Sequence, residues 1–175
     1  MLHGMRISWE RTDKAVNAFG KAVVRQAKGN LSRQKANASR TLHASIRYVF
    51  KDGLLRFMME TYGAFLDKGV SGTGKLWLSK TKSMPVAYNK SEGEPEFKFK
   101  PSKRAIGGTL KGWLRIRGIP LSAEFPIRRS IHARGIAPRR FFSNAFKSRY
   151  QKFSDEIERA VTADVNKQID NILKN

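Results

Sequence analysis

Hydrophobic residues recur at helical spacing near the start of the chain. The spaced residues are Val16, Phe19, Val23 and Ala27. Steps of three and four residues place them on one face of a helix. The pattern predicts an amphipathic helix over residues 12–28, with Thr12 as its N-cap and Gly29-Asn30 as its end. The polar stretch 31–44 leaves a continuation of this helix open.

Alternating hydrophobic residues on either side of Asp52-Gly53 predict a β-hairpin over residues 45–59. Asp-Gly suits a two-residue turn because both turn positions need positive φ angles. The expected cross-strand pairs are Lys51 with Leu54, Phe50 with Leu55, Tyr48 with Phe57 and Ile46 with Met59. The last three pairs share one face, and Arg47 and Arg56 lie on the opposite, wetter face.

The middle of the chain, residues 70–120, is rich in Gly, Pro, Ser and Lys. Short alternating pieces at Phe97–Lys100 and Trp113–Arg117 predict strands or extended arms rather than helix. A loop of this length without structure of its own is unusual. We therefore expect part of this insertion to form an extra hairpin or to order against a partner.

Helical patterns return in the last third of the chain. Residues 122–134 predict one helix, with Pro126 in its first turn and Gly135 as its left-handed end. A second helix is expected to begin near Pro138, a residue suited to the first helical position. Its aromatic stripe comprises Phe142, Phe146, Tyr150 and Phe153. A final helix, with Asp155-Glu156 near its start, extends this stripe through Ile157, Val161, Val165, Ile169 and Ile172.

These elements predict a single α+β domain over residues 1–175. It would comprise an N-terminal helix, an antiparallel sheet built on the hairpin at 45–59, an extended basic insertion at 70–120 and C-terminal helices. A hydrophobic content of 40% and 11 Phe residues are enough to form a globular core.

Charge constrains the partners of the protein. The chain has 35 Lys and Arg against 14 Asp and Glu, a net charge of +21. Residues 97–152 hold 15 basic residues and one acid, whereas residues 153–175 hold three basic and five acidic residues. Such a basic balance favours nucleic acid or acidic protein surfaces as partners.

Several functional classes find no support in the sequence. There is no Cys, which excludes disulfides and thiolate metal sites. An apolar run of about 18 residues is missing, so we expect no membrane segment. His3, His43 and His132 are scattered, and no acid–base–nucleophile set is recognisable. We therefore expect no catalytic site, no metal site and no cofactor, and we expect that the protein is not an enzyme.

Residues Gly69–Leu76 imitate the Gly and Lys spacing of a phosphate-binding loop. The position after Lys75 needs a Ser or Thr to hold magnesium, but it is Leu76. Trp77 and Pro85 also indicate extended chain where a helix should follow. We interpret the segment as a flexible Gly-rich loop.

The stretch from Lys98 to Lys152 interleaves cations with aromatic residues. These aromatic residues include Phe99, Trp113, Phe141 and Phe142, and Phe97 directly precedes the stretch. In nucleic-acid channels cations follow phosphates and rings stack on bases. A solvated basic face with buried aromatic residues explains the same pattern, and both interpretations remain open.

Two segments resemble the tail-completion, or neck, proteins of long-tailed bacteriophages. Tyr62–Gly69 is similar to an aromatic segment of that family that follows a hairpin, and Arg134–Phe142 is similar to its basic-Pro-Phe turn before the last helical region. The order of elements matches as well. The stretch between the two segments is longer than in the family pattern.

The resemblance implies a virion structural protein that joins head and tail, assembled in the host cytoplasm. It would form a ring homo-oligomer, a hexamer, which contacts the connector and the tail-tube or tail-terminator proteins around the path of the genomic DNA, with no membrane partner. The predicted subunit or partner contacts are Tyr62, Phe65, Gly69, Trp113, Pro138 and Phe141. The predicted contacts to phosphate or acidic partners are Lys98, Lys100, Lys103, Arg104, Arg115, Arg117, Arg139 and Arg140.

An alternative function of a different class is a free-standing basic protein that binds nucleic acid directly. Counterion release makes such binding fall steeply with salt. A ring held by apolar contacts persists at the same salt concentrations.

Overall fold

The computed structural model forms two compact units, which are described separately. It describes residues 8–34, 40–73, 75–77, 83–85, 99–100 and 109–174. The first unit comprises residues 1–30, 46–58 and 142–175, and the second comprises residues 31–45 and 59–141. The expectation of a single domain stays a prediction.

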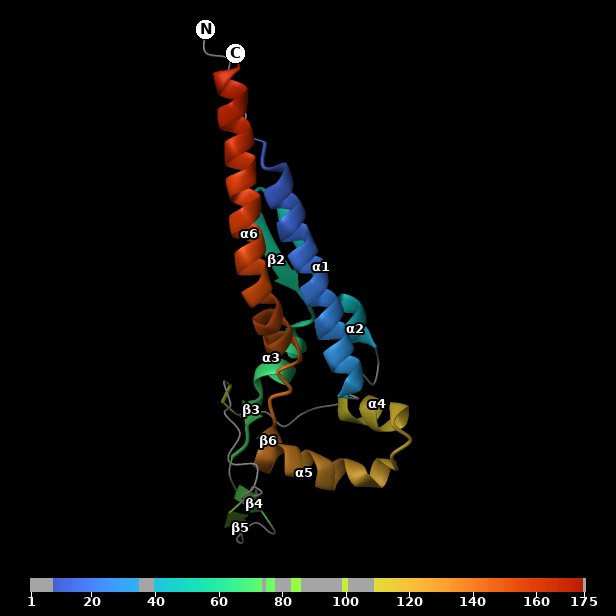
Figure 1. Cartoon of the computed structure of the whole chain (residues 1–175). Helices are drawn as coiled ribbons and strands as arrows, with labels where there is room; N and C mark the ends of the chain where they lie inside the picture. The colour runs from blue at the N-terminus through green and yellow to red at the C-terminus, as the bar shows by residue number, and fades with distance from the viewer. Residues whose placement is uncertain are drawn as a thin grey trace. The chain divides into compact units, whose positions relative to one another are not determined.

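Two long helices and a hairpin build the first unit (Figure 1). The elements are α1 (Glu10–Arg33), β1 (Arg47–Lys51), β2 (Leu54–Met58) and α6 (Phe141–Leu173). Thr12 bonds Asp164 and Gln26 bonds Ser148, so α1 and α6 lie side by side and antiparallel. This arrangement turns the apolar faces of both helices toward one interior.

The first turn of α1 is capped by a residue from the other end of the sequence. The buried carboxylate of Asp164, which is 2% exposed, accepts hydrogen bonds from the Arg11 N–H at 3.2 Å and the Thr12 N–H at 2.8 Å. The Thr12 hydroxyl donates to the same carboxylate at 2.9 Å. The predicted cap at Thr12 is therefore wrong. The helix begins at Glu10, and Asp164 satisfies the free N–H groups of its first turn.

The environment of Asp164 favours its ionised form. Burial raises the pKa of this carboxyl group, but the hydrogen bonds from Thr12 and Arg11, together with the positive charge of Arg11, outweigh burial and hold the pKa below its ordinary value. The folded state therefore binds the Asp164 proton more weakly than the unfolded state does.

The predicted end of α1 at Gly29-Asn30 is wrong, because the helix runs on to Arg33. Glycine within a helix costs about 1 kcal/mol relative to alanine. Leu31, two residues further on, is fully buried, and its burial contributes about 1.5–3 kcal/mol. The free energy gained by burying Leu31 therefore exceeds the cost of placing Gly29 within the helix.

The hairpin forms in the predicted register. Tyr48 pairs with Phe57 and Phe50 with Leu55, and these side chains are half-buried whereas Arg47 is exposed. The turn residues Asp52 and Gly53 have φ angles of 53° and 72°, as the two-residue turn requires. The predicted pair of Ile46 with Met59 lies outside the ladder, which ends at Arg47 and Met58.

The last helical region is one helix rather than two. α6 runs without a break from Phe141 to Leu173, so the predictions of a start at Pro138 and of a separate final helix near Asp155 are wrong. The aromatic stripe and the aliphatic stripe lie on this one helix. Its interior partner on α1 is Phe19, whose ring stacks on that of Phe153 at a centroid distance of 4.2 Å.

In its described residues, the second unit contains short helices and two small strand pairs. Its helices are α2 (Thr41–Ser45), α3 (Thr61–Lys68), α4 (Thr109–Ile116), the 3-10 helix η1 (Leu121–Ala123) and α5 (Glu124–Arg134). Its strands are β3 (Val70–Ser71), β4 (Lys75–Trp77), β5 (Ser83–Pro85) and β6 (Gly135–Ile136). β3 pairs with β6 and β4 pairs with β5, both antiparallel.

The prediction for the insertion is partly correct. The extra hairpin exists as β4–β5, and Phe99 forms a single bridge to Val70, whereas Phe97 and Lys98 lie outside the described residues. The prediction of extended chain at Trp113–Arg117 is wrong, because residues 109–116 form α4. Leu110 and Leu114, four residues apart, are the buried side chains there, so the helical period determines this segment.

The predicted helix over residues 122–134 is present as α5, which begins at Glu124 because residues 121–123 form the 3-10 helix η1. Pro126 is the third residue of the helix, in its first turn, where a missing N–H costs no helical hydrogen bond. Gly135 follows the last helical residue with a φ of 81°, and its N–H donates to the carbonyl of Ile131. Helices and antiparallel strands thus coexist in one chain, and the α+β class is confirmed. None of the helices in the described part of the chain has an apolar stretch long enough to cross a bilayer.

We expect Asp164→Asn to destabilise the protein in a pH-dependent way. At pH 7 the substitution removes a carboxylate that accepts three hydrogen bonds. Because the pKa of Asp164 is depressed in the folded state, its contribution is complete above the ordinary Asp value of about 4 and is lost as the pH falls through the lower folded value. Urea unfolding at pH 7 and pH 3 should show a large difference between variant and wild type at pH 7 and a smaller one at pH 3.

Asp155→Asn is the matched control, because this carboxylate is exposed on the same helix. It should change the urea midpoint little at either pH. Equal effects of the two substitutions at both pH values would contradict the role assigned to Asp164.

Candidate interaction surfaces

The two segments that carry the family resemblance meet in the second unit. The N–H of Arg139 donates to the carbonyl of Leu66 at 2.9 Å, and the N–H of Arg140 donates to the carbonyl of Asp67 at 2.9 Å. The last carbonyls of a helix have no partner within the helix. The turn before α6 therefore caps the end of α3, and we call this contact between residues 62–69 and 134–142 the junction.

Glycine makes the junction possible. Gly69 follows α3 with a φ of 72°, and a Cβ atom there would lie 2.8 Å from the Cδ of Pro138 and 2.9 Å from the carbonyl oxygen of Ile136. The strands then pair Val70 with Ile136 and Ser71 with Gly135. Backbone approaches this closely only where the side chain is absent. Gly69 therefore has a structural role within the unit.

The other predicted contact residues divide into exposed and buried sets. Tyr62 and Phe65 are exposed on α3, at 46% and 40%, and Trp113 is exposed on α4 at 38%. Pro138 is half-buried at the junction. Phe141 is fully buried, so it has no surface to offer a partner in this structure.

Ring contacts hold two of the exposed aromatic residues in place. Phe65 meets Phe99 edge to face at a centroid distance of 4.7 Å. The guanidinium of Arg117 lies 5.9 Å from the centroid of the Trp113 ring, within the range of a cation–π interaction. Trp113 on α4 and Arg117 directly after this helix, which are four residues apart in the basic-aromatic stretch, are therefore neighbouring side chains.

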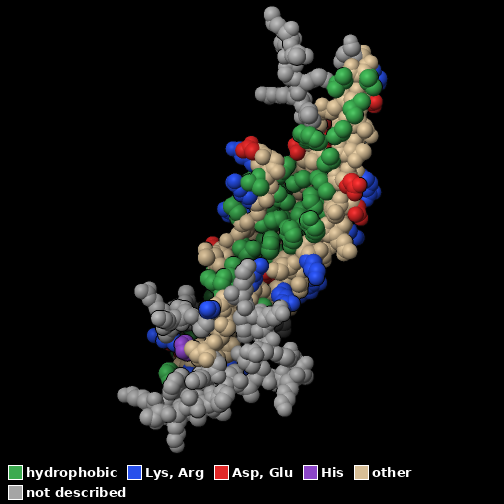
Figure 2. Space-filling view, turned by 90° about the vertical axis from the view of Figure 1, so that its left-hand side faces the viewer, with side chains coloured by type: hydrophobic (Ala, Val, Ile, Leu, Met, Phe, Trp, Pro, Cys, Tyr) green, Lys and Arg blue, Asp and Glu red, His purple; other side chains and the backbone are tan. Residues whose placement is uncertain are grey.

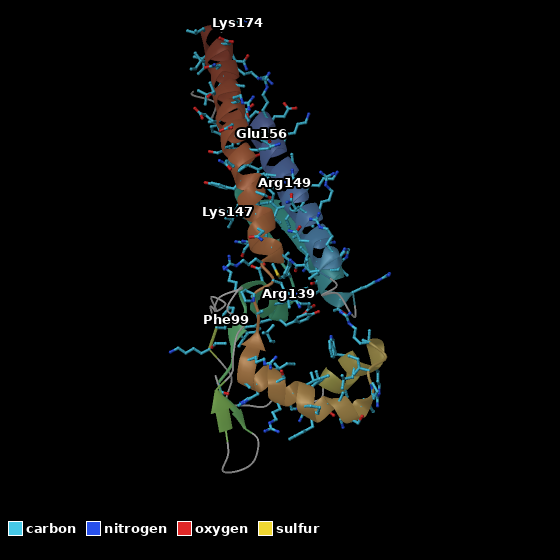
Figure 3. All side chains as sticks on the ribbon, turned by 60° about the horizontal axis from the view of Figure 1, so that its bottom comes forward. Phe99, Arg139, Lys147, Arg149, Glu156 and Lys174 are labelled. Atoms are coloured by element: carbon cyan, nitrogen blue, oxygen red, sulfur yellow. The ribbon has the colours of Figure 1, made fainter. Side chains whose placement is uncertain are left out.

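The predicted cations fall in two described places. Arg115 and Arg117 are exposed at the end of α4 and beyond it, and Arg139 and Arg140 are exposed at the junction. Lys100 is exposed next to Phe99. Phe99 and Arg139 both lie beside the end of α3 (Figure 3), bonded through main-chain groups to Gly69 and Leu66. The remaining residues, Lys98, Lys103 and Arg104, lie outside the described residues.

A row of cations on α1 was not among the predicted site residues. The row comprises Lys14, Lys21, Arg25 and Lys28. Steps of seven, four and three residues place it on one face, opposite Phe19 and Val23, and over about 21 Å of helix. None of the ion pairs described in the structure involves it. The heptad-like spacing of the cations was a signal available in the sequence.

Six aromatic residues from three elements form an aromatic cluster in the first unit. They are Phe19, Phe57, Phe142, Phe146, Tyr150 and Phe153. Only Phe19 among them is buried; Tyr150 is 54% exposed and the others are half-buried. Figure 2 shows a broad hydrophobic area on this side of the unit, with charged side chains at its margins. The cluster therefore contributes to the core around Phe19 and also leaves apolar surface exposed to solvent.

The two other kinds of site considered from the sequence are a metal site and a phosphate-binding loop. Among them, no group of three or more His, Asp or Glu side chains could hold a metal ion. Strands β3 and β4 occupy parts of the segment that imitates a phosphate-binding loop, so its interpretation as a flexible loop is wrong there. The expected extended chain at Trp77 and Pro85 is confirmed by β4 and β5. An open depression of about 440 Å³ beside the first turn of α1 is lined by both signs of charge, including Lys167 and Asp170.

Comparisons of the chain with protein-family models, with curated proteins and with solved structures find no match. The surfaces above therefore provide the basis for a functional proposal.

We expect Gly69→Ala to destabilise the second unit more than Gly118→Ala does. Both glycines have positive φ angles, of 72° and 65°, which cost a non-glycine residue roughly 1–2 kcal/mol. A Cβ at Gly118 meets nothing within 4 Å, whereas one at Gly69 meets Pro138 and the Ile136 carbonyl. Overpacking adds about 1–3 kcal/mol at Gly69.

Urea unfolding of the two variants measures this difference directly. Equal losses for Gly69→Ala and Gly118→Ala would mean that the close approach at the junction does not exist.

Proposed function

We propose that this protein is a structural subunit of the neck of a long-tailed bacteriophage, a ring component that links connector and tail around the DNA. The proposal assigns binding rather than a reaction to the chain and requires no cofactor. Its partners would be further copies of the chain, the connector, and tail-tube or tail-terminator proteins. It would act in the virion after assembly in the host cytoplasm.

The observation that carries the proposal is the junction. The two segments that resemble the neck proteins are separated by more than 60 residues in the sequence. They nevertheless contact each other through two main-chain hydrogen bonds and a strand pair. Two segments that resemble the same family and also contact each other support the neck function better than two motifs that lie apart.

The charge distribution is compatible with a ring around DNA. The second unit holds 20 of the 35 basic residues and six of the 14 acids. An excess of basic over acidic residues of this size favours phosphate or acidic protein surfaces as partners. The half-exposed aromatic cluster supplies apolar surface for contacts between proteins.

The cation row on α1 favours the second candidate function, direct binding of nucleic acid by a free-standing protein. Its four cations lie along one helix face without described ion pairs. A row of cations that only faces solvent would look the same. The row therefore supports this function only if its removal weakens the binding of nucleic acid.

Purified virions test the first proposal. We expect the chain to occur in them at a small fixed copy number by quantitative mass spectrometry, and deletion of its gene to yield unjoined heads and tails in electron micrographs. Intact tailed particles that form without the protein would overturn the neck function.

Salt titration tests the second candidate. Binding of a DNA duplex by the four-cation row should give a slope of log K against log salt of about −3.6, and Lys21→Gln with Arg25→Gln should reduce that slope by about 1.8. Arg47→Gln with Arg56→Gln on the hairpin, two exposed cations outside the predicted contacts, is the matched control. If the α1 pair changes neither affinity nor slope, the row does not bind nucleic acid.

A further inference from the structure

The end of α6 carries an apolar surface that its own unit leaves exposed. This end stripe comprises Val165, Ile169, Ile172 and Leu173, which are 38%, 47%, 54% and 79% exposed. It follows Asp164, the residue that caps the first turn of α1. α6 therefore extends past the beginning of α1, and its last turns have no neighbouring helix among the described residues.

The residues of the end stripe are spaced like those of a helix face that packs against another element. Val165, Ile169 and Ile172 follow at steps of four and three residues, which places them on one side of α6. Isolated exposed aliphatic residues need no explanation, but a row at helical spacing marks an interaction surface. Such a row fits an apolar face on another molecule.

A second apolar surface in the same unit has the matching chemistry. The aromatic cluster leaves five of its six rings partly exposed, and its hydrophobic area is visible in Figure 2. Exposed cations flank it on α6, where Lys147 and Lys152 alternate with its rings along the helix. Lys147 projects from the same stretch of α6 as the aromatic stripe (Figure 3).

The distribution of charge along the chain indicates which surface can bind the aromatic cluster. Copies of a chain with a net charge of +21 repel each other, so they associate only where opposite charges meet. Residues 141–154 of α6 hold three basic residues and no acid, whereas residues 155–173 hold five acids and two basic residues. Asp155, Glu156 and Glu158 are exposed. Asp164 is buried in the cap of α1, and the other four acids of this half still exceed its two basic residues. The second half of α6 is thus apolar and mildly acidic, and complements an apolar surface flanked by cations.

We propose that the end stripe of one copy packs on the aromatic cluster of a second copy, with the acids of the second half of α6 beside the cations that flank the cluster. The two surfaces differ, so the contact is head-to-tail. Head-to-tail contacts form a closed ring when the rotation between copies closes. This inference rests on the proposed function, for which it names the contact between subunits.

Two variants that each damage one surface test the proposal. Ile169→Lys with Ile172→Lys alters the end stripe, and Tyr150→Lys alters the exposed edge of the cluster. All three side chains are exposed, so the monomer should fold, as circular dichroism and urea unfolding can verify. Phe125→Lys is the matched control, because this residue is 70% exposed in the second unit and belongs to neither surface.

Sedimentation of the purified proteins provides the result. The wild type and the Phe125→Lys control should form rings, whereas each surface variant alone should be monomeric, with self-association weakened at least tenfold. An equimolar mixture of the two variants retains one intact end stripe and one intact cluster. It should therefore form a dimer and no larger species.

The outcomes separate this inference from the proposed function. If the surface variants form rings as the wild type does, or if their mixture forms no dimer, the inference is overturned and the neck function stands. If virions assemble normally without the protein, the neck function is overturned, whereas the mixing experiment still decides the head-to-tail contact.

Discussion

The first unit depends on the ring of Phe19. It stacks on Phe153 of α6 and meets Phe146 and the hairpin residue Phe57 at centroid distances of 5.6 and 6.3 Å. One buried side chain thus joins two helices and a hairpin that are distant in the sequence. Aromatic contacts of this kind add about 0.5–1.5 kcal/mol each beyond the burial of apolar area. Because Phe19 is the only buried member, the rings around it remain available at the surface.

Polar contacts set the register of the two helices around that ring. Asp164 accepts from the first turn of α1, and further along Gln26 donates to Ser148 at 3.0 Å and accepts from Arg149. Apolar packing alone tolerates sliding of one helix along another, whereas hydrogen bonds at two separated places do not. The register then leaves the last turns of α6 beyond the beginning of α1, where the end stripe is exposed.

Net charge and exposed apolar surface together set the conditions under which copies of this chain would associate. A strongly basic chain stays soluble and separate through self-repulsion, and it requires acids in the right place to bind another copy. The acids concentrated in the second half of α6 meet this requirement. The junction of the second unit, by contrast, is made of main-chain hydrogen bonds and glycine contacts, which favour a fixed backbone.

The sequence by itself determined the features that depend on neighbouring residues. Asp52-Gly53 fixed the hairpin register because a two-residue turn admits one pairing, and the apolar periodicity predicted the helical face of α6. The exposure of Tyr62 and Phe65 was compatible with the predicted contacts, but the burial of Phe141 was not visible locally. The cation row on α1 could have been found from its spacing.

Only the tertiary structure decided the features that join distant residues. The cap of α1 comes from Asp164, more than 150 residues away, α1 continues past Gly29 because Leu31 is buried, and α4 is a helix because Leu110 and Leu114 are buried four residues apart. Local preferences at these positions are about 1 kcal/mol. Burial of one large apolar side chain contributes more, so packing rather than local sequence determined the outcome.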